Sequence, residues 1–531
     1  MRSWIIAFLM LVLITISWIP QGQGQGNPVN PGDIYDAAIA LFYKEKYEEA
    51  IATFSQIILS FSKSNLVSYS RYMIGQCYLK MEKYDKAIQQ FDLYLKAYPD
   101  GDRVKGATRG IQTSKEKLKE KEKGKTPPSD PRGGESGNTS AAQATVNGRP
   151  RSLFEGSLLN AHRVKRRICA QAFYLEGKNL EEVEKRIRSL KEAGVNTLIF
   201  RVFQNKGDRI YKFANPQYEE GVYFKTEHAP VVDDLLGKVA AIAHRHGLDL
   251  FAWMTTRYAA YGYDGHPELH CKSYNFETKK LEVARGFNLF RPDVLKRLEG
   301  LFRDLGRYPI DGILFQDDLI LKHNEDFSAE ANKAFFREFG YSPHPDLFYI
   351  EPYRSDSGKY YVKAYSDKFW VWARWKNRWL MNVAKQLMTA AKESNPKLEF
   401  GINLYYETVL NTSNAVAWFS QTLYEAVEKD FDYYAIMAYH RQTMNELGMD
   451  EKKAFDLMAE VAQKAIKSLV DPFQVMMKIQ VLDWKSYEVI PTREVETLLK
   501  KILGQGEVSL VFVPSIEQFP LQHLKGKWTP K

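Results

Sequence analysis

The segment "DGILFQDDLIL", residues 311–321, decides the fold. An apolar run from Ile313 to Phe315 leads into two adjacent carboxylates, Asp317 and Asp318, after which the sequence turns apolar again. Two neighbouring acids repel each other and lose solvation when they are buried, so a core strand does not normally end in this way. The pattern indicates a buried strand whose C-terminal end carries a polar site.

Seven other apolar, strand-like runs accompany this segment, and helical periodicity fills most of the intervals between them. Eight buried strands that alternate with helices predict an α/β fold, a (β/α)8 TIM barrel that occupies residues 160–525. A doubly wound open sheet is the alternative, but no glycine-rich phosphate loop follows the first run, so the barrel is favoured. The seven runs are residues 167–175, 196–204, 248–256, 399–407, 433–440, 474–484 and 508–515.

Residues 33–123 have the periodicity of an all-α region and contain a repeat. The stretches "KEKYEEAIATFSQII" (44–58) and "MEKYDKAIQQFDLYL" (81–95) superimpose at an offset of 37 residues, the distance from position 44 to position 81. This pattern resembles the tetratricopeptide family, with a helix over 102–123 closing the stack. The resemblance implies an interaction platform, and a plain helical hairpin without a ligand is the alternative.

The two remaining segments have compositions that are typical of processing signals and linkers. Residues 1–26 place one Arg before an apolar block and a Gly/Gln tract after it, which predicts a signal peptide or a short membrane anchor. Residues 124–150 are dense in Gly, Pro, Ser and Thr, which predicts a flexible linker. The chain is therefore expected to be exported to the periplasm or the cell envelope.

The chain has a formal net charge of +9, and much of it lies in local basic runs at 114–125 and 162–167. Such runs usually form solvated surfaces or linkers, and no nucleic-acid-binding motif accompanies them, so no nucleic-acid partner is expected. The three cysteines, Cys77, Cys169 and Cys271, are too few and too scattered for a disulfide framework or a metal cluster. We therefore expect neither a metal nor a cofactor.

In a parallel barrel the chemistry lies where the strands end, because the loops at the C-terminal face converge there. The ends of these runs carry acids, amides and aromatics without a cluster of His ligands, a set that suits carbohydrate chemistry. Arg201 and Asp483 could instead form a buried ion pair, and Trp253 could belong to the core. The candidates for substrate binding are Arg201, Trp253, Gln316, Asn403, Tyr405, Tyr439, Asp483 and Trp484, and those for catalysis are Asp317, Asp318 and Glu407.

Residues 165–525 resemble the C-terminal glycoside-hydrolase domain of the PgaB-type proteins of poly-β-1,6-N-acetylglucosamine export. The motifs "IDGILFQDD", "NLYYETVLNTSNAVAWFSQ", "DYYAIMAYH" and "QVLDWKSYEVIPTREV" carry the resemblance. It implies an endo-acting glycosidase on a partially de-N-acetylated poly-β-1,6-glucosamine exopolysaccharide of biofilms, with a protein partner in the export machinery bound through the repeats. The alternatives are a non-catalytic polysaccharide-binding export component and an envelope scaffold unconnected with sugars.

This sequence departs from the PgaB type in two respects. A metal-dependent deacetylase domain usually precedes the hydrolase domain, but residues 1–160 lack its metal-binding His pair and its Asp-rich motif. Deacetylase activity is therefore not expected. In addition, many relatives have His where this chain has Gln316, which changes how protons are handled at that position.

The strand motif of the neighbouring chitinase-like barrels, DGxDxDxE, suggests which acid acts. When the motif is aligned on Asp311 and Gly312, its proton-donating Glu falls on Asp318. Side chains at i and i+2 share one face of a strand, so Asp318 is expected to face the site together with Gln316, while Asp317 points away and orients a loop. The nearby charge of Asp317 and partial burial should raise the pKa of Asp318.

The identity of the second carboxylate remains open. Glu407 and Asp483 are both candidates, and only their distance from the acid separates retaining from inverting chemistry. The stretch "IMAYH" resembles the "MxYD" of the chitinases, which implies that Tyr439 lies near the sugar.

Overall fold

The computed structural model describes residues 31–43, 45–61, 66–99, 101, 103–123, 164–513 (except 264, 356, 357, 359 and 470) and 526. Contacts divide the chain into two compact units, and the described residues fall into a helical unit up to position 123 and a barrel unit from position 164. The predicted signal or anchor at 1–26 and the predicted linker at 124–150 lie outside the described residues. No helix within the described ranges has the length and apolar character needed to cross a membrane.

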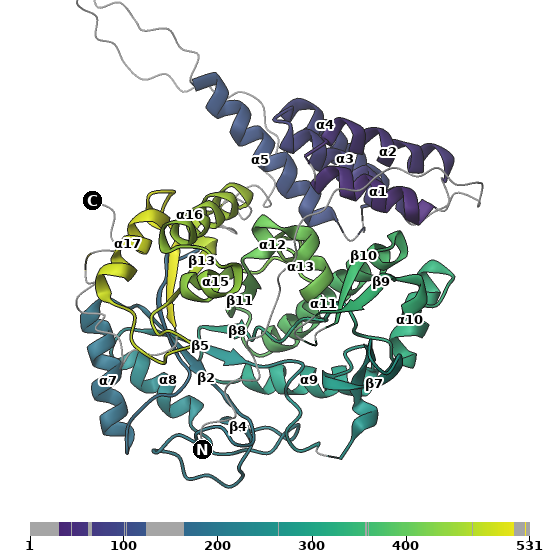
Figure 1. Ribbon diagram of the computed structural model, residues 1–531. Helices are drawn as coiled ribbons and strands as arrows, with labels where there is room; N and C mark the ends of the chain where they lie inside the picture. The colour runs from purple at the N-terminus through teal and green to yellow at the C-terminus, as the bar shows by residue number, and fades with distance from the viewer. Residues whose placement is uncertain are drawn as a thin grey trace, which may run out of the picture. The chain divides into compact units, whose positions relative to one another are not determined.

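Five helices in succession form the helical unit (Figure 1). Each helix packs on the next one along the chain, which is the arrangement of stacked helical hairpins. The predicted all-α region is therefore confirmed. The helices are α1 (Pro31–Tyr43), α2 (Tyr47–Ser60), α3 (Leu66–Lys80), α4 (Tyr84–Ala97) and α5 (Val104–Lys123).

The sequence repeat is reproduced in the backbone. Glu45 and Glu82 precede α2 and α4, and both adopt a left-handed conformation, with φ of 60° and 55°. The following residues, Lys46 and Lys83, both have φ of −86° and nearly equal ψ of 63° and 64°. The turns before α2 and α4 therefore have the same backbone conformation, and they lie 37 residues apart, as the two repeated stretches do.

Two glycines let the helices around α4 approach closely. The ring of Phe91 lies fully buried in α4. A Cβ added at Gly75 of α3 would lie 2.6 Å from this ring, and one added at Gly110 of α5 would lie 2.3 Å from it. Because real Cβ atoms do not come this near, both positions need glycine for Phe91 to fill the groove between the helices.

Eight parallel strands form a closed barrel in the second unit, as predicted. Their order around the barrel is their order along the chain, so each strand pairs with the one before it and the last pairs with the first. The strands are β1 (Ile168–Ala172), β2 (Thr197–Arg201), β5 (Asp249–Met254), β8 (Gly312–Phe315), β11 (Glu399–Tyr405), β12 (Tyr433–Ala438), β13 (Val475–Gln480) and β14 (Ser509–Val513).

Helices cover the outside of the barrel, and α7 shows why these segments are helical. Asn179 accepts a hydrogen bond from the N–H of Glu182 at its start, and Gly194 ends it with φ of 96°. Its buried residues recur every three or four positions, which turns one face to the barrel. The main helices are α7 (Leu180–Ala193), α8 (Leu236–Arg245), α9 (Pro292–Leu305), α10 (Ala329–Phe339), α11 (Asp367–Lys392), α15 (His440–Leu447), α16 (Glu451–Ser468) and α17 (Thr492–Leu503).

The loops that leave the C-terminal ends of the strands carry further structure. Two-stranded antiparallel ribbons follow β2, β5 and β8, and short helices follow β11. The ribbons are β3 (Phe203–Gln204) with β4 (Gly221–Val222), β6 (His270–Asn275) with β7 (Lys280–Phe287), and β9 (Tyr349–Arg354) with β10 (Tyr360–Tyr365). The short helices are α12 (Glu407–Leu410), α13 (Thr412–Phe419) and α14 (Leu423–Val427).

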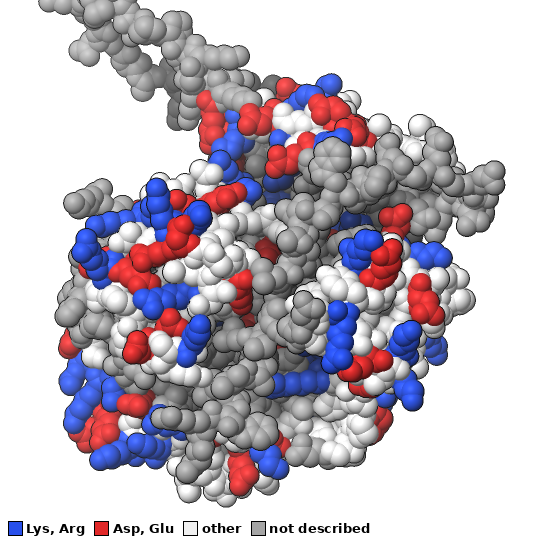
Figure 2. Space-filling view, in the orientation of Figure 1, with Lys and Arg blue, Asp and Glu red and all other residues white. Residues whose placement is uncertain are grey.

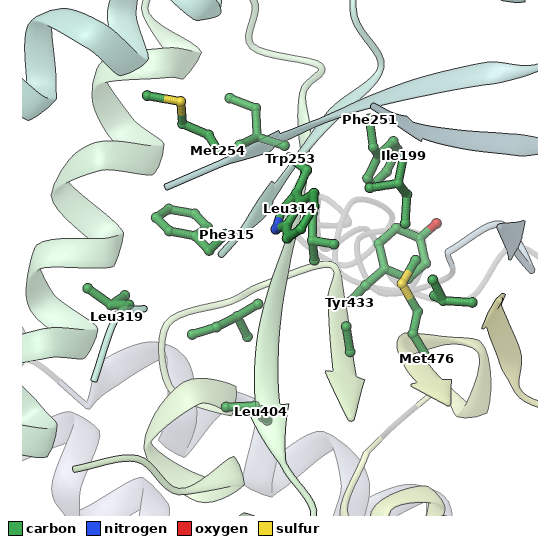
Figure 3. Close-up of a cluster of buried hydrophobic side chains, with 14 of the residues drawn as sticks. Ile199, Phe251, Trp253, Met254, Leu314, Phe315, Leu319, Leu404, Tyr433 and Met476 are labelled. Carbon is green, nitrogen blue, oxygen red and sulfur yellow. The ribbon is translucent and has the colours of Figure 1, made fainter. Parts of the chain in front are cut away.

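The interior of the barrel is filled with side chains. Figure 3 shows Ile199, Phe251, Tyr433 and Met476 gathered in one group, with Phe315 apart from them. A Cβ at Gly312 would lie 2.5 Å from the ring of Phe251, so glycine at the start of β8 makes room for that ring. This packing leaves the ends of the barrel as the places for polar side chains.

Positive and negative side chains are interspersed over the face of the protein in Figure 2. The net charge of +9 therefore does not gather into a single basic patch among the described residues on that face.

An ion network closes the N-terminal end of the barrel. Arg167 is buried there and donates hydrogen bonds to Asp249 at 2.6 Å, to Glu399 and to the hydroxyl of Tyr433 at 2.8 Å. Its guanidinium also lies over the ring of Phe251, 4.5 Å from the ring centre. Because the carboxylates that begin β5 and β11, on either side of β8, both bond to one buried cation, Arg167 ties the floor of the barrel together.

Replacement of this cation predicts a large loss of stability. Arg167→Met leaves Asp249 and Glu399 without their buried partner and should lower the free energy of unfolding by about 3–5 kcal/mol. Lys165→Met is the matched control, because Lys165 contacts the same Asp249 at 2.7 Å but is half exposed, so its loss should change stability by about 0–1 kcal/mol. No tryptophan occurs between positions 19 and 252, so tryptophan fluorescence during urea unfolding reports the barrel. Equal losses in the two variants would contradict the assigned role of Arg167.

Candidate functional site

Asp318 does not face the mouth of the barrel. It is fully buried, and its carboxylate accepts hydrogen bonds from the end of β5. Thr255 donates its hydroxyl at 2.6 Å, and Thr256 donates both its hydroxyl, at 2.8 Å, and its N–H, at 2.9 Å. The N–H of Tyr258 donates a further bond at 2.8 Å. The prediction that Asp318 faces the site is therefore wrong.

The prediction failed because it assumed that the strand continues through both acids, whereas β8 ends before them. β8 stops at Phe315, the N–H of Gln316 makes a last bond to the carbonyl of Met254 of β5 at 2.8 Å, and the chain turns at residues 317–318. Alternation of faces holds only along a strand, so the turn reverses the two acids. Asp317 is the half-buried carboxyl at the C-terminal end, and Gln316 is half-buried beside it.

Asp317 lies among polar groups from three other strands. Burial raises the pKa of its carboxyl above the usual value, Lys478 of β13 opposes this shift, and the charge of Asp318 adds to it. Burial and then the charge of Asp317 raise the pKa of Tyr439, which follows β12. The pKa of Tyr405, at the end of β11, is also raised by burial and next by Asp317. Asp317 therefore lies within electrostatic reach of Tyr405 and Tyr439, although the sequence analysis expected it to point away from the site.

Lys478 is a residue of this cluster that the sequence analysis missed. It is buried in the barrel and donates a hydrogen bond from Nζ to Oδ1 of Asn403 at 2.8 Å. Burial lowers its pKa to about 8, while the charge of Asp317 raises it. Alternation along β13 could have revealed it, because Lys478 and Gln480 are polar residues two positions apart and share one face of an otherwise apolar strand.

Asn403 has a different position from the one expected of a sugar-binding amide. Its side chain is buried, and its Nδ2 donates to the carbonyl of Phe315 at 2.9 Å while its Oδ1 accepts from Lys478. Both ends of the amide are therefore engaged inside the protein. Asn403 connects Lys478 to the last residue of β8, directly before the turn that carries Asp317.

Glu407 is a second carboxyl at a strand end, directly after β11. It begins α12, is 8% exposed, and its Oε2 has no hydrogen-bond partner among the described residues. Burial raises its pKa to about 7, and the charge of Glu446 adds to the shift. Its own charge contributes to the raised pKa of Tyr405 after burial, Asp317 and Tyr258, so Glu407 is within electrostatic reach of a tyrosine that Asp317 also influences.

Aromatic rings from four strand ends meet beside these acids. Phe173, which follows β1, stacks on Trp253 with ring centres 5.0 Å apart and on Trp484 at 6.4 Å. Trp484 meets the ring of Tyr439 edge-on at 5.7 Å. Trp253 is buried, whereas Phe173 is 37% exposed and Trp484 is half-buried. The sequence predicts Trp484 here, but it gave no reason to choose Phe173.

Two other candidates form structural ion pairs, but not with each other. Arg201 is paired with Asp208 and lies over the ring of Phe203 at 4.3 Å. Asp483 accepts from Arg441 at 3.1 Å and from the N–H of Lys485 at 2.7 Å. These contacts contradict the alternative in which Arg201 and Asp483 pair with each other. Of the two candidates for the second carboxyl, both oxygens of Asp483 thus accept hydrogen bonds, whereas Oε2 of Glu407 accepts none from the described residues.

Within the described residues, no group of three or more His, Cys, Asp or Glu side chains could hold a metal ion. The arrangement instead offers two carboxyls with raised pKa values, two tyrosines, a buried lysine and a half-exposed aromatic surface. Such a set can transfer protons and bind an apolar ring face.

Comparisons with known proteins agree with this reading of the fold. The profile of a family described as "Hypothetical glycosyl hydrolase family 13" matches residues 176–512, and a tetratricopeptide repeat profile matches residues 69–101. The structure of the PgaB (BpsB) glycoside hydrolase domain from Bordetella bronchiseptica is similar, with a TM-score of 0.54 and 20% identity, over 70% of this chain and 100% of that one.

Two curated relatives are similar in sequence. Both are named "Poly-beta-1,6-N-acetyl-D-glucosamine N-deacetylase", from Escherichia coli strain K12 and from Escherichia coli O157:H7. Each is 26% identical over 278 residues, which make up 50% of this chain and 37% of the relative. The chain therefore matches little more than a third of the length of these relatives.

The reversal of the two acids makes a prediction about stability that does not depend on activity. Asp318→Asn removes the acceptor from at least two buried donors and should lower the free energy of unfolding by about 2–4 kcal/mol. Asp317→Asn is the matched neighbour and should change it by less than about 1 kcal/mol, because burial already disfavours the charged form. Urea unfolding followed by tryptophan fluorescence measures both. A stable Asp318→Asn protein with a destabilised Asp317→Asn protein would restore the original assignment.

Proposed function

The chain belongs to the family described as hypothetical glycosyl hydrolase family 13, and from this premise we propose that it is an exported endo-glycosidase. Its substrate in this proposal is a partially de-N-acetylated poly-β-1,6-glucosamine exopolysaccharide. The name of the curated relatives, which refers to poly-β-1,6-N-acetyl-D-glucosamine, supports that substrate class. The observation that carries the proposal is Asp317, a half-buried carboxyl with a raised pKa at the C-terminal end of the barrel.

Asp317 is the general acid in this mechanism. A carboxyl whose pKa is raised by burial keeps its proton closer to neutral pH and can deliver it to the leaving glycosidic oxygen as the C–O bond breaks. Asp318 then has a supporting role, because its hydrogen bonds to the end of β5 fix the turn that presents Asp317. The general acid in this proposal is therefore Asp317 and not Asp318, the residue that the chitinase-like motif indicated.

Glu407 is the second carboxyl of the mechanism. Glycosidases of the common type use a pair of carboxyl groups, one as the acid and the other as the base or the nucleophile. Glu407 has an oxygen without a hydrogen bond and influences the same tyrosine as Asp317, which supports this role. Asp483 is less suited to it, because Arg441 and a backbone N–H already engage its oxygens.

The aromatic surface beside the acids suits a sugar ring. The exposed part of Phe173 and the half-buried ring of Trp484 present apolar area next to Tyr439, and aromatic faces pack on the C–H groups of pyranose rings. Gln316 contributes an amide oxygen that lacks a hydrogen bond within the described residues. The proposal assigns this oxygen the role of accepting a hydrogen bond from a sugar hydroxyl or amine.

The cellular setting is the remaining part of the proposal. We place the protein in the periplasm or the cell envelope, with the helical repeats as the contact to a protein of the export machinery. Deacetylation is not assigned to it, because residues 1–160 lack the metal-binding His pair of the deacetylase domain. A polysaccharide-binding component without turnover is the alternative that the following experiment distinguishes.

Replacement of either catalytic carboxyl, Asp317 or Glu407, by its amide should strongly reduce cleavage without unfolding the protein. Asp317→Asn and Glu407→Gln are each expected to slow hydrolysis of the partially de-N-acetylated polymer by about 10²–10⁴-fold, the usual contribution of general acid–base catalysis. Asp346→Asn alters an exposed acid and should leave the rate unchanged. Product length by gel filtration or mass spectrometry measures the rate, and a polymer pull-down measures binding.

Each alternative has its own outcome in that assay. Wild-type protein that binds the polymer but never shortens it would support the non-catalytic alternative. Full activity in Asp317→Asn would overturn the assignment of the acid.

Lys478 predicts the direction of a change in the pH profile. Asp317 must be protonated to act, so activity falls as the pH rises through its pKa. The positive charge of Lys478 lowers that pKa, so Lys478→Met should raise it and move the basic limb of the kcat/KM profile to higher pH. Lys485→Met, at an exposed position, is the control and should not move the limb. A uniform loss of rate with an unmoved limb would show that Lys478 acts only through structure.

A further inference from the structure

We propose that Arg441 is a positioning residue that holds the indole of Trp484 beside Tyr439 and thereby sets how tightly the sugar chain is bound. Arg441 lies in α15, which follows β12, whereas Trp484 lies in the loop that leaves β13. α15 and β13 lie next to each other (Figure 1). This inference rests on the proposed function, because it assigns a support to one part of the proposed sugar-binding surface.

Arg441 binds two carboxylates at once. Its Nε and Nη2 donate to the two oxygens of Glu494 at 2.7 Å and 2.6 Å, and its Nη1 donates to Oδ2 of Asp483 at 3.1 Å. Glu494 lies in the first turn of α17, and Asp483 immediately precedes Trp484. The donors of a guanidinium lie in a rigid plane, so this pairing fixes the directions of both acids relative to α15.

Asp483 passes this constraint to the turn that presents Trp484. Its Oδ1 accepts hydrogen bonds from the N–H of Lys485 at 2.7 Å and from the N–H of Ser486 at 3.3 Å, while its Oδ2 faces Arg441. One oxygen therefore closes the turn and the other binds the cation. Of the described side chains outside this loop, Arg441 is the one that bonds to the turn.

Both carboxylates are charged near neutral pH, so the pairing persists there. Burial alone would raise the pKa of Glu494, but Arg441 and His440 lower it to about 2. Burial also disfavours the charged form of Asp483, but the N–H of Lys485 and then Arg441 hold its pKa below the usual value. The support for Trp484 therefore does not depend on the protonation of either acid near neutral pH.

Glu494 also holds the segment of the second ring, Tyr439, through the next residue. His440 follows Tyr439 in the chain and is fully buried, and its Nε2 lies 2.8 Å from Oε1 of Glu494. Tyr439 is thus the chain neighbour of one residue in this ion network, as Trp484 is of Asp483. The rings of Tyr439 and Trp484 meet edge-on with centres 5.7 Å apart. One network therefore supports both rings.

The arrangement predicts an effect on binding rather than on the chemical step. Every nitrogen of the Arg441 guanidinium is engaged by Glu494 or Asp483, and the catalytic carboxyls are not among its partners. Without Arg441 the turn is held less firmly, so the half-buried ring of Trp484 loses its fixed orientation. A sugar must then order that ring when it binds, which weakens affinity.

The protein contains a matched control for this pairing. Arg245, the last residue of α8, donates from Nε and Nη2 to the two oxygens of Glu184 in α7 at 3.1 Å and 3.0 Å. The adjacent His246 places its Nε2 2.8 Å from the same carboxylate. The contacts are those of a His–Arg–Glu group, but they join two outer helices before β5 begins, at the opposite end of the barrel from the proposed site.

The test is a double-mutant cycle between Arg441 and Trp484 in the full-length protein. Arg441→Met should raise the KM for the partially de-N-acetylated polymer about three- to tenfold and change kcat by less than about twofold. In a Trp484→Ala background the same substitution should have no further effect, because the ring through which it acts is gone. Arg245→Met should leave both constants unchanged.

Two further variants separate geometry from charge. Asp483→Asn keeps an oxygen for the N–H of Lys485 but removes the charge that Arg441 binds, so it should reproduce the KM of Arg441→Met. Arg441→Lys keeps the charge but lacks the planar fork, so it should not restore the wild-type KM. A wild-type KM in either variant would overturn the assigned role.

A measurement without substrate separates this inference from the proposed function. Acrylamide should quench tryptophan fluorescence more strongly in Arg441→Met than in the wild type, because the ring of Trp484 becomes more accessible. This difference should vanish in the Trp484→Ala background, since the other tryptophans keep their surroundings.

Each outcome decides one of the two claims. If the wild type neither binds nor cleaves the polymer, the proposed function fails, and unchanged quenching would then overturn the role of Arg441 as well. If the wild type cleaves the polymer but Arg441→Met still raises the KM in the Trp484→Ala background, Arg441 acts elsewhere and the inference fails while the enzyme assignment stands. A selective increase in KM that disappears with Trp484 supports the inference.

Discussion

The geometry of the site depends on the hydrogen bonds that Asp318 accepts from the residues at the end of β5. Asp318 itself belongs to the turn after β8, so these bonds hold that turn against β5. A buried carboxylate is tolerable only when donors replace its lost water, and two threonine hydroxyls and two backbone N–H groups do so here. The bonds fix where β8 stops. They therefore decide that the preceding side chain, Asp317, is the one left at the end of the barrel.

The two ends of the barrel use buried cations in different ways. At the N-terminal end Arg167 neutralises carboxylates from two strands and closes the floor. At the C-terminal end Lys478 faces a single acid, Asp317, whose pKa is nevertheless raised. Burial and the charge of Asp318 therefore outweigh the attraction of the lysine. A fully satisfied pair stabilises the fold, whereas a partly satisfied one leaves a proton that can be transferred.

The sequence predicted correctly the features that rest on a periodic pattern. It did not predict the orientation of side chains beyond the end of a strand, where the pattern stops. Eight apolar runs gave all eight barrel strands, and the offset between positions 44 and 81 gave the paired turns before α2 and α4, because both signals are sums over many residues. The faces of Asp317 and Asp318 depend on the hydrogen bonds that hold Asp318 to Thr255, Thr256 and Tyr258, and no sequence pattern reveals these bonds. The ion-pair partner of Arg201 could not be predicted either, because the sequence contains many acids. The partner is Asp208, in the loop that follows the strand of Arg201.

The long connection after β8 is held by buried charges rather than by apolar packing alone, which explains how it can present functional groups. Arg257 donates to Glu325 at 3.1 Å, and Lys376 of α11 donates to the carbonyl of Lys322 at 2.7 Å. Such bonds are directional, so they set the path of residues 316–327 more narrowly than contacts between methyl groups would. Asp318 fixes the first part of this segment and Arg257 and Lys376 fix its last part. Asp317 therefore lies on a loop that is held at both ends, while the elaborated loops gather at the C-terminal face, where parallel barrels carry their chemistry.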